Sequence, residues 1–213
     1  MSQAGASSFS QEKCARLSER FVKNNTWHDP TLVAFRISSL GDDPELLNDP
    51  RLRYIPKAIK EEWDPEKSDL SKLLTKDDFA GAKRSFSKML VEVAAMRRSG
   101  VEFLVGTDAP GVPYCFPGFS VHDEMALFVK AGLTPMESLQ AATRNPAKCL
   151  GLLDSLGTIE RGKIADLVLL DANPLDDIQN TQKINAVIVN GRLLTRLVLD
   201  GLLTQVEEAA KSK

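Results

Sequence analysis

The stretch Gly100-Val-Glu-Phe-Leu-Val-Gly-Thr-Asp-Ala-Pro110 is the most informative part of this 213-residue chain. Val101–Val105 is almost continuously apolar, which is typical of a strand buried on both faces of a parallel sheet. Gly106-Thr107-Asp108 ends this strand and leads into a loop rich in Gly and Pro. The pattern predicts a buried strand with a polar turn at its carboxyl end.

Working outward, the residues before this strand predict a crossover unit. Thr75 is placed to cap a long helix over Lys76–Gly100, in which apolar residues recur at helical spacing. The short apolar run Pro30–Ile37 predicts another buried strand, while residues 38–56 read as irregular. Strand, long helix and strand in this order predict a parallel α/β arrangement.

The remaining segments predict helices around a small antiparallel part. Asn190-Gly191 between apolar runs is a strong hairpin signal, and Thr134-Pro135-Met136-Glu137 has the form of a capping box. The expected strands are 166–171, 184–189 and 192–194. The other expected helices run from about Phe9 to Asn24, after Pro56, over Val121–Lys130, after Thr134 and after Asn145, and from Thr195 or Arg196 to about Ala210.

Composition excludes several classes of protein. Lys plus Arg is 27 and Asp plus Glu is 29, so the charge balance gives no reason to expect nucleic acid as a partner. The two histidines and three scattered cysteines argue against a self-contained zinc centre and against a disulfide framework. No membrane span is expected, because the apolar window 103–122 is interrupted by Gly and Pro. The Ser-rich start has no signal-peptide core, so the cytoplasm is the default expectation and the compartment of a longer protein stays open.

Four segments together resemble the C-terminal portion of the metal-dependent amidohydrolase superfamily, in its prolidase-like and imidazolonepropionase-like branch. They are GVEFLVGTDAP (100–110), FSVHDEMALFVKAGLTPMESLQAATRNPAKCLGL (119–152), GTIERGKIADLVLLDANPLDDIQNT (157–181) and INAVIVNGRLL (184–194). TWHDPTLVAFR (26–36) is similar to the penultimate barrel strand of that branch. The resemblance implies an α/β fold: the C-terminal part of a (β/α)8 TIM-like barrel over residues 1–150, followed by a small β-sandwich-type segment and closing helix over 151–213.

The resemblance also implies chemistry for Asp108. This residue matches the aspartate of the last barrel strand, which is a metal ligand and catalytic residue in the family. A bound divalent ion, zinc being the expected one, lowers the pKa of a water that attacks the substrate carbonyl, and the aspartate takes up its proton. The other ligands, a His-x-His pair, a lysine and two single histidines, have no counterpart, so this chain alone is not expected to hold the metal stably.

Three further residues carry assignments. His122 opens the helix that follows the Gly/Pro-rich loop, and it is predicted either to contact substrate or to make a local helix-start hydrogen bond. His122 and Glu124 are not expected to act as a pair, because residues two apart do not share a helix face. Tyr114 lies in the loop that lines or covers the pocket by family position, so it is a second candidate for substrate binding; the apolar residues of this loop can equally pack over the barrel mouth. His28, just before Pro30, is interpreted as a surface or loop residue.

Two functions remain open on the sequence. The first is a segment of a hydrolase that acts on carbon–nitrogen bonds, either non-peptide or X-Pro-type, in a small amide or dipeptide-like substrate. The second is a catalytically inactive fragment or pseudoenzyme that serves as a binding or assembly module. A complete barrel of this type needs about 250 residues. The chain is therefore expected to be incomplete and inactive alone, and either to self-associate through exposed sheet edges or to need a missing N-terminal half.

Overall fold

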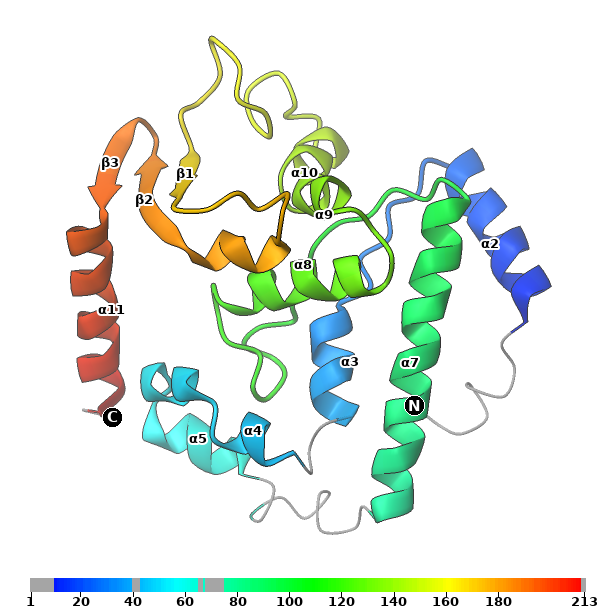
Figure 1. Cartoon of the computed structure of the whole chain (residues 1–213), viewed down its shortest axis with the longest axis horizontal. Coiled ribbons are helices and arrows are strands. Elements are labelled where there is room, and N and C mark those ends of the chain that lie inside the picture. Colours follow the sequence, from blue (N-terminus) through cyan, green and yellow to red (C-terminus); the bar gives the residue numbers. More distant parts are fainter. Residues whose placement is uncertain (1–9, 40–42, 65–66, 68–74, 212–213) are drawn as a thin grey trace.

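The computed structural model describes residues 10–39, 43–64, 67 and 75–211. Most of these residues are helical, and a three-stranded antiparallel sheet lies near the C-terminal end. Figure 1 shows the long helix α7 on one side of the molecule, α8 across the middle, and the sheet with α11 on the other side. Within the described residues, no helix is long and apolar enough to cross a membrane.

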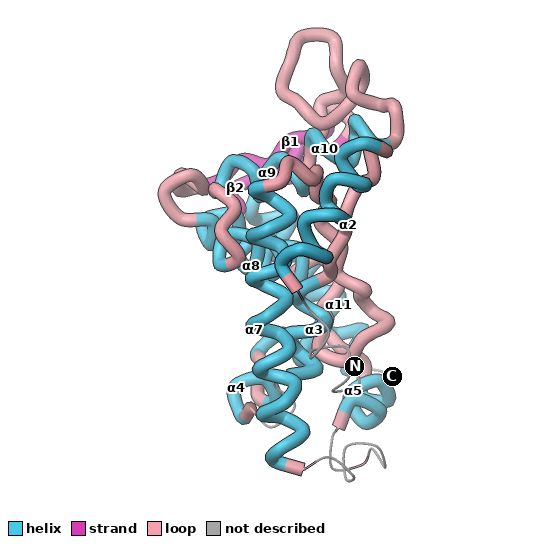
Figure 2. The backbone as a smooth tube through the Cα atoms, turned by 90° about the vertical axis from the view of Figure 1, so that its right-hand side faces the viewer, coloured by secondary structure: helices cyan, strands magenta, loops and turns pink. Residues whose placement is uncertain are grey.

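The first two long helices begin at side chains that cap them. The Ser10 side chain accepts a hydrogen bond from the N–H of Lys13 at the start of α2 (Gln11–Lys23). Thr75 and Asp78 form a reciprocal capping box at the start of α7 (Lys76–Arg98). Both predicted helices are confirmed, although Phe9 itself lies outside the described residues. The two helices lie side by side in Figures 1 and 2 and pack together.

The prediction of a strand over Pro30–Ile37 was wrong. The segment forms the helix α3 (Leu32–Ser39), which packs against α7 and α8. Leu32 and Val33 are almost fully buried, so the continuous apolar run marks a buried helix rather than a buried strand. Short apolar runs of this length fit both structures, and periodicity alone does not separate them.

Of the predicted parallel α/β sheet, the described residues contain a single parallel bridge. Val101–Val105 is extended, but its pairing with the chain consists of one isolated parallel bridge, between Phe103 and His28. Within the described residues, this bridge is all that corresponds to the two expected barrel strands. Residues 26–36, which are similar to a penultimate barrel strand, stop being strand-like near Asp29. Pro30 and Thr31 (φ 44°) turn the chain into α3 there.

The segment expected to be irregular contains short helical turns. They are α4 (Pro44–Leu47) and the 3-10 helix η1 (Pro50–Tyr54). The helix predicted after Pro56 is present as α5 (Lys57–Trp63). Asp43 and Asp49 each precede a proline, and each side chain accepts a hydrogen bond from a backbone N–H two residues on. The Asp-Pro pairs therefore start helices here, because Asp caps the orphan N–H and Pro already has a helical φ.

The middle of the chain follows the prediction. It forms α8 (Ser120–Lys130), α9 (Pro135–Ala142) and α10 (Arg144–Cys149). The capping box at Thr134 and Glu137 is present at the start of α9. α8 lies over the core, where the Phe103 and Phe128 rings meet edge to face at 5.8 Å. This contact joins the extended segment to the helix that follows its loop.

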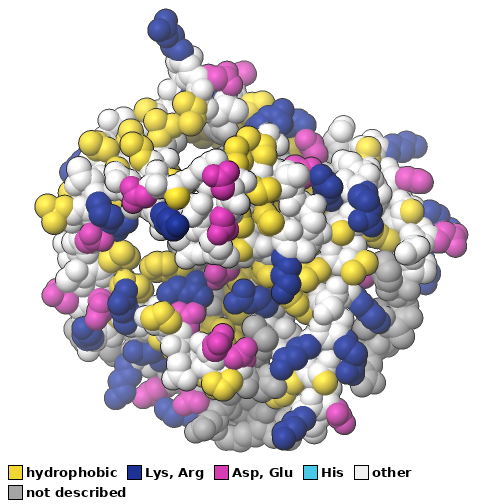
Figure 3. Space-filling model, viewed as in Figure 1, with side chains coloured by type: hydrophobic (Ala, Val, Ile, Leu, Met, Phe, Trp, Pro, Cys, Tyr) yellow, Lys and Arg dark blue, Asp and Glu magenta, His cyan; other side chains and the backbone are white. Residues whose placement is uncertain are grey.

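The C-terminal part is a meander followed by a helix. It contains β1 (Leu167–Leu170), the 3-10 helix η2 (Ile178–Gln182), β2 (Ile184–Val189), β3 (Arg192–Thr195) and α11 (Arg196–Lys211). Asn190 and Gly191, both at positive φ, make the predicted hairpin between β2 and β3. The described residues form one sheet here rather than the two layers of a sandwich. Figure 3 shows hydrophobic side chains gathered over this sheet on the viewed face.

Candidate functional site

The site is built where two extended segments end side by side. The His28 N–H donates to the Glu102 carbonyl at 3.0 Å, and the Leu104 N–H donates to the His28 carbonyl at 2.9 Å. Because the pairing is parallel, both segments end at the same edge. Asp29 follows one segment and Asp108 follows the other. Chemistry in parallel α/β proteins collects at this carboxyl edge.

Asp29 links the two segments, a role that the sequence reasoning missed. Its carboxylate accepts hydrogen bonds from the backbone N–H groups of Thr31 and Gly106. Burial raises the pKa of Asp29, and the nearby charge of Asp108 raises it further, while the two hydrogen bonds oppose the shift. The only sequence signal was the Asp-Pro pair, which is more often a turn feature.

Asp108 lies at the predicted position, just beyond the end of Val101–Val105. Its backbone is in the left-handed region (φ 56°), and its side chain is exposed. Its carbonyl accepts a hydrogen bond from the Val112 N–H at 3.2 Å, which closes the first turn of the loop. The charge of Asp108 raises the pKa of three neighbouring groups, Asp29, Cys115 and Glu124. Asp108 is therefore close to these three groups, and its role as a metal ligand stays a prediction.

Glu124 is the most buried acid of the site. It belongs to α8 and is fully buried, and its two carboxylate oxygens accept hydrogen bonds from the first N–H groups of α3. Burial raises the pKa of Glu124 to about 8, the charges of Asp29 and Asp108 add to the rise, and the two backbone hydrogen bonds oppose it. Sequence reasoning noticed Glu124 only as a neighbour of His122.

His122 points to a different part of the molecule. Its Nδ1 lies 3.0 Å from the Thr181 hydroxyl, which itself donates to the Ile178 carbonyl at 2.8 Å. The Thr181 hydroxyl therefore bridges His122 and Ile178, and which group donates between Nδ1 and the hydroxyl depends on the tautomer of His122. Burial lowers the pKa of His122, against the opposing charge of Asp123. His122 and Glu124 contact different elements, η2 and α3, in line with the expectation that they do not act as a pair.

Tyr114 is buried and His28 is half-buried. Tyr114 donates from its hydroxyl to the Trp63 carbonyl at 3.3 Å and packs on the Trp63 ring. Its substrate-binding role stays a prediction. His28 is half-buried between the rings of Phe21 and Phe103, and burial lowers its pKa. The interpretation of His28 as a surface or loop residue is met only in part: it lies outside the named helices and strands, but it is half-buried and its backbone bridges to Phe103.

The residues present do not fit a metal ion by themselves. Over the described part of the chain, no group of three or more His, Cys, Asp or Glu side chains is arranged to hold one. Three or four ligands are normally needed. The Glu124 oxygens already accept backbone hydrogen bonds, and so does the Asp29 carboxylate. Cys115, whose thiol pKa is raised to about 12 by burial above all, is not a ready thiolate donor.

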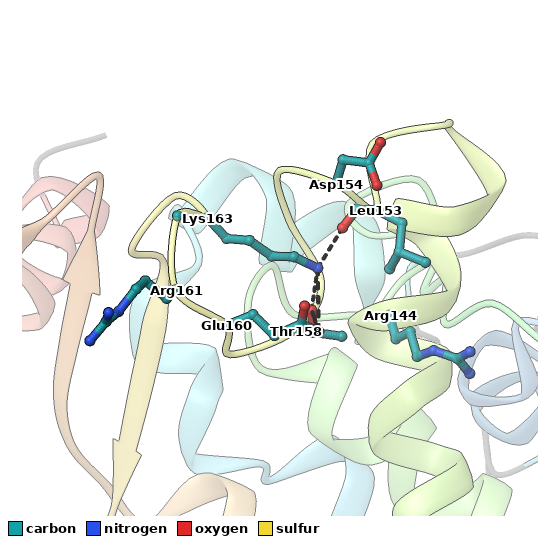
Figure 4. A pocket seen from close by; sticks show the side chains of 8 residues that line it. Arg144, Leu153, Asp154, Thr158, Glu160, Arg161 and Lys163 are labelled. Carbon is teal, nitrogen blue, oxygen red and sulfur yellow. Dashed lines mark hydrogen bonds and ion pairs between the residues drawn. The ribbon is translucent and has the colours of Figure 1, made fainter.

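A separate polar hollow lies in the connection between α10 and β1. Its volume is about 510 Å³, and Arg144, Thr158, Arg161 and Lys163 are among the residues that line it. Figure 4 shows the Lys163 ammonium bonded to the Leu153 carbonyl and the Thr158 hydroxyl, while the two arginine side chains extend away from each other. Lys163 thus fastens the loop, and the hollow shares no lining residue with the acids around Asp108.

The described structure places Asp29 and Asp108 at the ends of two segments that pair in parallel, and Glu124 in the neighbouring helix α8. The model of the Amidohydrolase family matches residues 62–194, which is more than half of the chain. The chain belongs to this family. The matched residues include Asp108, Tyr114, His122 and Glu124, whereas Asp29 and α3 lie before them.

Curated relatives match over limited lengths. The chain is 40% identical over 89 residues to an imidazolonepropionase of Agrobacterium fabrum, covering 39% of this chain and 20% of the relative. It is 31% identical over 140 residues to an S-triazine hydrolase of Gordonia rubripertincta, covering 57% and 29%. An ochratoxinase of Aspergillus niger is 32% identical over 117 residues, covering 54% and 23%. The chain spans less than a third of the length of these relatives.

Solved structures match over most of this chain. A bottromycin amidohydrolase has a TM-score of 0.69 at 25% identity, covering 86% of this chain and 40% of that one. A Xaa-Pro dipeptidase with bound methionine has a TM-score of 0.57 at 24% identity, covering 84% and 36%, and shows likeness of fold. The chain thus has the fold of part of an amidohydrolase.

Proposed function

We propose that this chain is the C-terminal portion of a metal-dependent hydrolase that acts on carbon–nitrogen bonds, either non-peptide or X-Pro-type. The observation that carries the proposal is the position of Asp108. It follows an extended segment that pairs in parallel with a second one, at the edge where both segments end. The match of the family model over this region supports it. In this proposal residues 1–150 are part of a barrel, and residues 151–213 are its closing β segment and helix.

Asp108 is proposed as a metal ligand and proton acceptor of the complete enzyme. The exposed carboxylate at a segment end is accessible to an ion and to substrate. The described residues supply no full ligand set, so we assign this chain no hydrolytic step of its own. The expected ion is zinc, and it would be shared with ligands from outside the described residues.

Two residues are proposed to contact a small amide or dipeptide-like substrate. Nδ1 of His122 already contacts the Thr181 hydroxyl, which leaves Nε2 as the ring nitrogen proposed to face substrate. Such a nitrogen, where it is unprotonated, can accept a hydrogen bond from a substrate amide N–H. Tyr114 is the weaker candidate for substrate binding, because its hydroxyl already donates a hydrogen bond to the Trp63 carbonyl. The similarity to an S-triazine hydrolase and an ochratoxinase supports a small-molecule substrate.

A second function, a non-catalytic binding or assembly module, is favoured by two hydrogen bonds. The edge of Val101–Val105 that faces away from His28 is already occupied: the Asn145 amide donates to the Phe103 carbonyl at 3.0 Å, and the Val105 N–H donates to the Ala141 carbonyl at 3.1 Å. A further barrel strand would need these same backbone groups. These two hydrogen bonds therefore support a non-catalytic module in which this edge of Val101–Val105 does not pair with a further strand.

Metal binding and turnover by the purified chain separate the two functions. We expect no turnover of amides or X-Pro dipeptides with added Zn²⁺ or Mn²⁺. Turnover that disappears in Asp108→Ala would show that the chain is a complete enzyme. A reading frame upstream of Met1 that encodes a His-x-His motif would support the hydrolase portion. Co-expression of that frame with this chain should then restore metal binding, and failure to do so would favour the module.

A further inference from the structure

The first turn of α3 has an unusual cap. The N–H groups of Leu32 and Val33 have no acceptor within their own helix, as at every helix start. They donate to Oε1 and Oε2 of Glu124 at 2.8 and 2.6 Å. The acceptor is 92 and 91 residues away in sequence and belongs to α8. A side chain usually caps its own helix, so this contact joins two elements rather than completing one.

The burial of Glu124 makes this contact specific. The side chain is fully buried, so its carboxylate has no water to replace the two N–H donors. A buried polar group that loses its partner costs the full desolvation penalty. The positive end of the α3 dipole also favours a carboxylate at this position. The charges of Asp29 and Asp108 raise the pKa of Glu124, and the charge of Glu124 raises the pKa of Cys115.

A chain of contacts continues from this cap to the Asp108 loop. Thr31, the residue before Leu32, donates its N–H to Asp29, and Asp29 also accepts from Gly106. Gly106 is two residues before Asp108. Movement of the α3 start would therefore move Asp29, and with it the hydrogen bond to Gly106. α8 begins directly after the same loop, so Glu124 secures the loop from its other end.

We propose that Glu124 is a positioning residue that holds the start of α3 and the Asp29 carboxylate in place against the Asp108 loop. Glu124 would touch neither substrate nor metal, and it would act through Leu32, Val33 and Asp29. The significance of the loop rests on the function proposed above for Asp108. The hydrogen-bonded connection itself stands on the contacts of Glu124 and Asp29 alone.

Amide hydrogen exchange of the full chain tests the proposal. Glu124→Gln keeps the size of the side chain but replaces one acceptor oxygen with an NH₂ group that cannot accept. The comparison is made above pH 8, where the carboxyl of the parent protein is ionised. Glu124→Gln should speed exchange at Leu32 and Val33 about tenfold, because one or both hydrogen bonds are lost. Exchange within twofold of the parent would overturn the proposal.

The exchange rate of the Gly106 amide distinguishes a positioning role of Glu124 from a role as a helix cap alone. A positioning role predicts that Gly106 also exchanges faster in Glu124→Gln, although its partner is Asp29. Acceleration confined to Leu32 and Val33 would mean that Glu124 is only a cap, and would overturn the positioning role. The matched control is Glu137→Gln, which removes a capping-box acceptor from α9 and should leave all three amides unchanged.

Two further measurements keep the test decisive. Should Glu124→Gln fail to fold, the unsubstituted protein still provides a test. Leu32 and Val33 should then be protected in its native state, and exchange at unprotected rates would refute the connection. Asp108→Asn separates this inference from the proposed function. It should abolish metal binding in a reconstituted enzyme and leave exchange at Leu32 and Val33 unchanged.

Discussion

The carboxylate of Asp29 accepts a hydrogen bond from the backbone N–H of Gly106, two residues before Asp108. This contact needs the absence of a side chain at 106. A Cβ built there would lie 2.2 Å from Oδ2 of Asp29 and 2.7 Å from its Cγ. The whole carboxylate would have to move, so the glycine is required by close approach rather than by its backbone angles.

Gly106→Ala is therefore expected to lower the free energy of unfolding by about 1–3 kcal/mol, since it displaces Asp29 and breaks its hydrogen bond. Urea denaturation measures the change. The matched control is Gly201→Ala within α11, where an added Cβ meets nothing within 4 Å. There, higher helix propensity should stabilise the protein by up to about 1 kcal/mol. Equal effects of the two substitutions would contradict the close approach.

The burial of Glu124 predicts a pH dependence. Its pKa is raised from 4.5 to about 8 in the folded protein, so the folded state binds the proton more tightly than the unfolded state. The free energy of unfolding should therefore fall as pH rises from about 4.5 to about 8, by at most about 1.4 kcal/mol per pH unit from this group. Below and above this window Glu124 contributes no slope.

Urea denaturation of the parent and of Glu124→Gln across this pH range measures the effect. The difference between the two proteins removes the contributions of other groups, such as Asp29, whose pKa is also raised, and His28 and His122, whose pKa values are lowered. The parent should lose stability relative to the variant as pH rises. Parallel curves would show that Glu124 does not titrate in this window.

The ion pairs of Arg51 predict a third effect on stability. Arg51 donates to Asp123 at 2.6 Å and to Asp49 at 2.7 Å, and its guanidinium lies over the Phe116 ring at 4.6 Å. The three charged side chains are mostly shielded from solvent. Asp123→Asn should lower the free energy of unfolding by about 1–3 kcal/mol, because Arg51 loses a charged partner.

Asp200→Asn is the control for Asp123→Asn. Asp200 pairs with Arg196 at a similar distance, 2.9 Å, but both side chains are well exposed to solvent. Such pairs contribute about 0.3–0.5 kcal/mol. Thermal melting and urea denaturation of the two variants should rank Asp123→Asn as clearly more damaging. The reverse ranking would contradict the assigned role of the Arg51 pairs.

Self-association remains expected, but through a different surface from the one that the sequence suggested. Thr31–Ile37 is largely helical, and both sides of Val101–Val105 are bonded. Exposed apolar side chains lie instead on the sheet and on α11, among them Leu193 and Leu197. Light scattering after size-exclusion chromatography should give a mass above that of one chain.

Replacing Leu193 and Leu197 with Ser should lower that mass. Ile159→Ser is the control, because Ile159 is 86% exposed but lies in the loop before β1. A clean monomer of the parent protein would refute the expectation, and an equal response to Ile159→Ser would place the association elsewhere.

The candidate site was predicted only in part. The sequence pattern placed Asp108 at the end of an extended segment, because an apolar run followed by Gly-Thr-Asp is a local signal. The contributions of Asp29 and Glu124 depend on partners far away in the chain, at Gly106 and at Leu32 and Val33. A single sequence holds no sign of such pairs.

The sequence by itself determined the elements whose signals are local. The capping boxes at Thr75 and Thr134 and the Asn190-Gly191 hairpin form as predicted, because each is stabilised by residues within three or four positions. Tertiary structure decided the conformation of residues 30–37. Their apolar run satisfies a buried strand and a buried helix equally, and the helix prevails where Glu124 supplies its first two N–H groups with acceptors and α7 and α8 cover its apolar side chains.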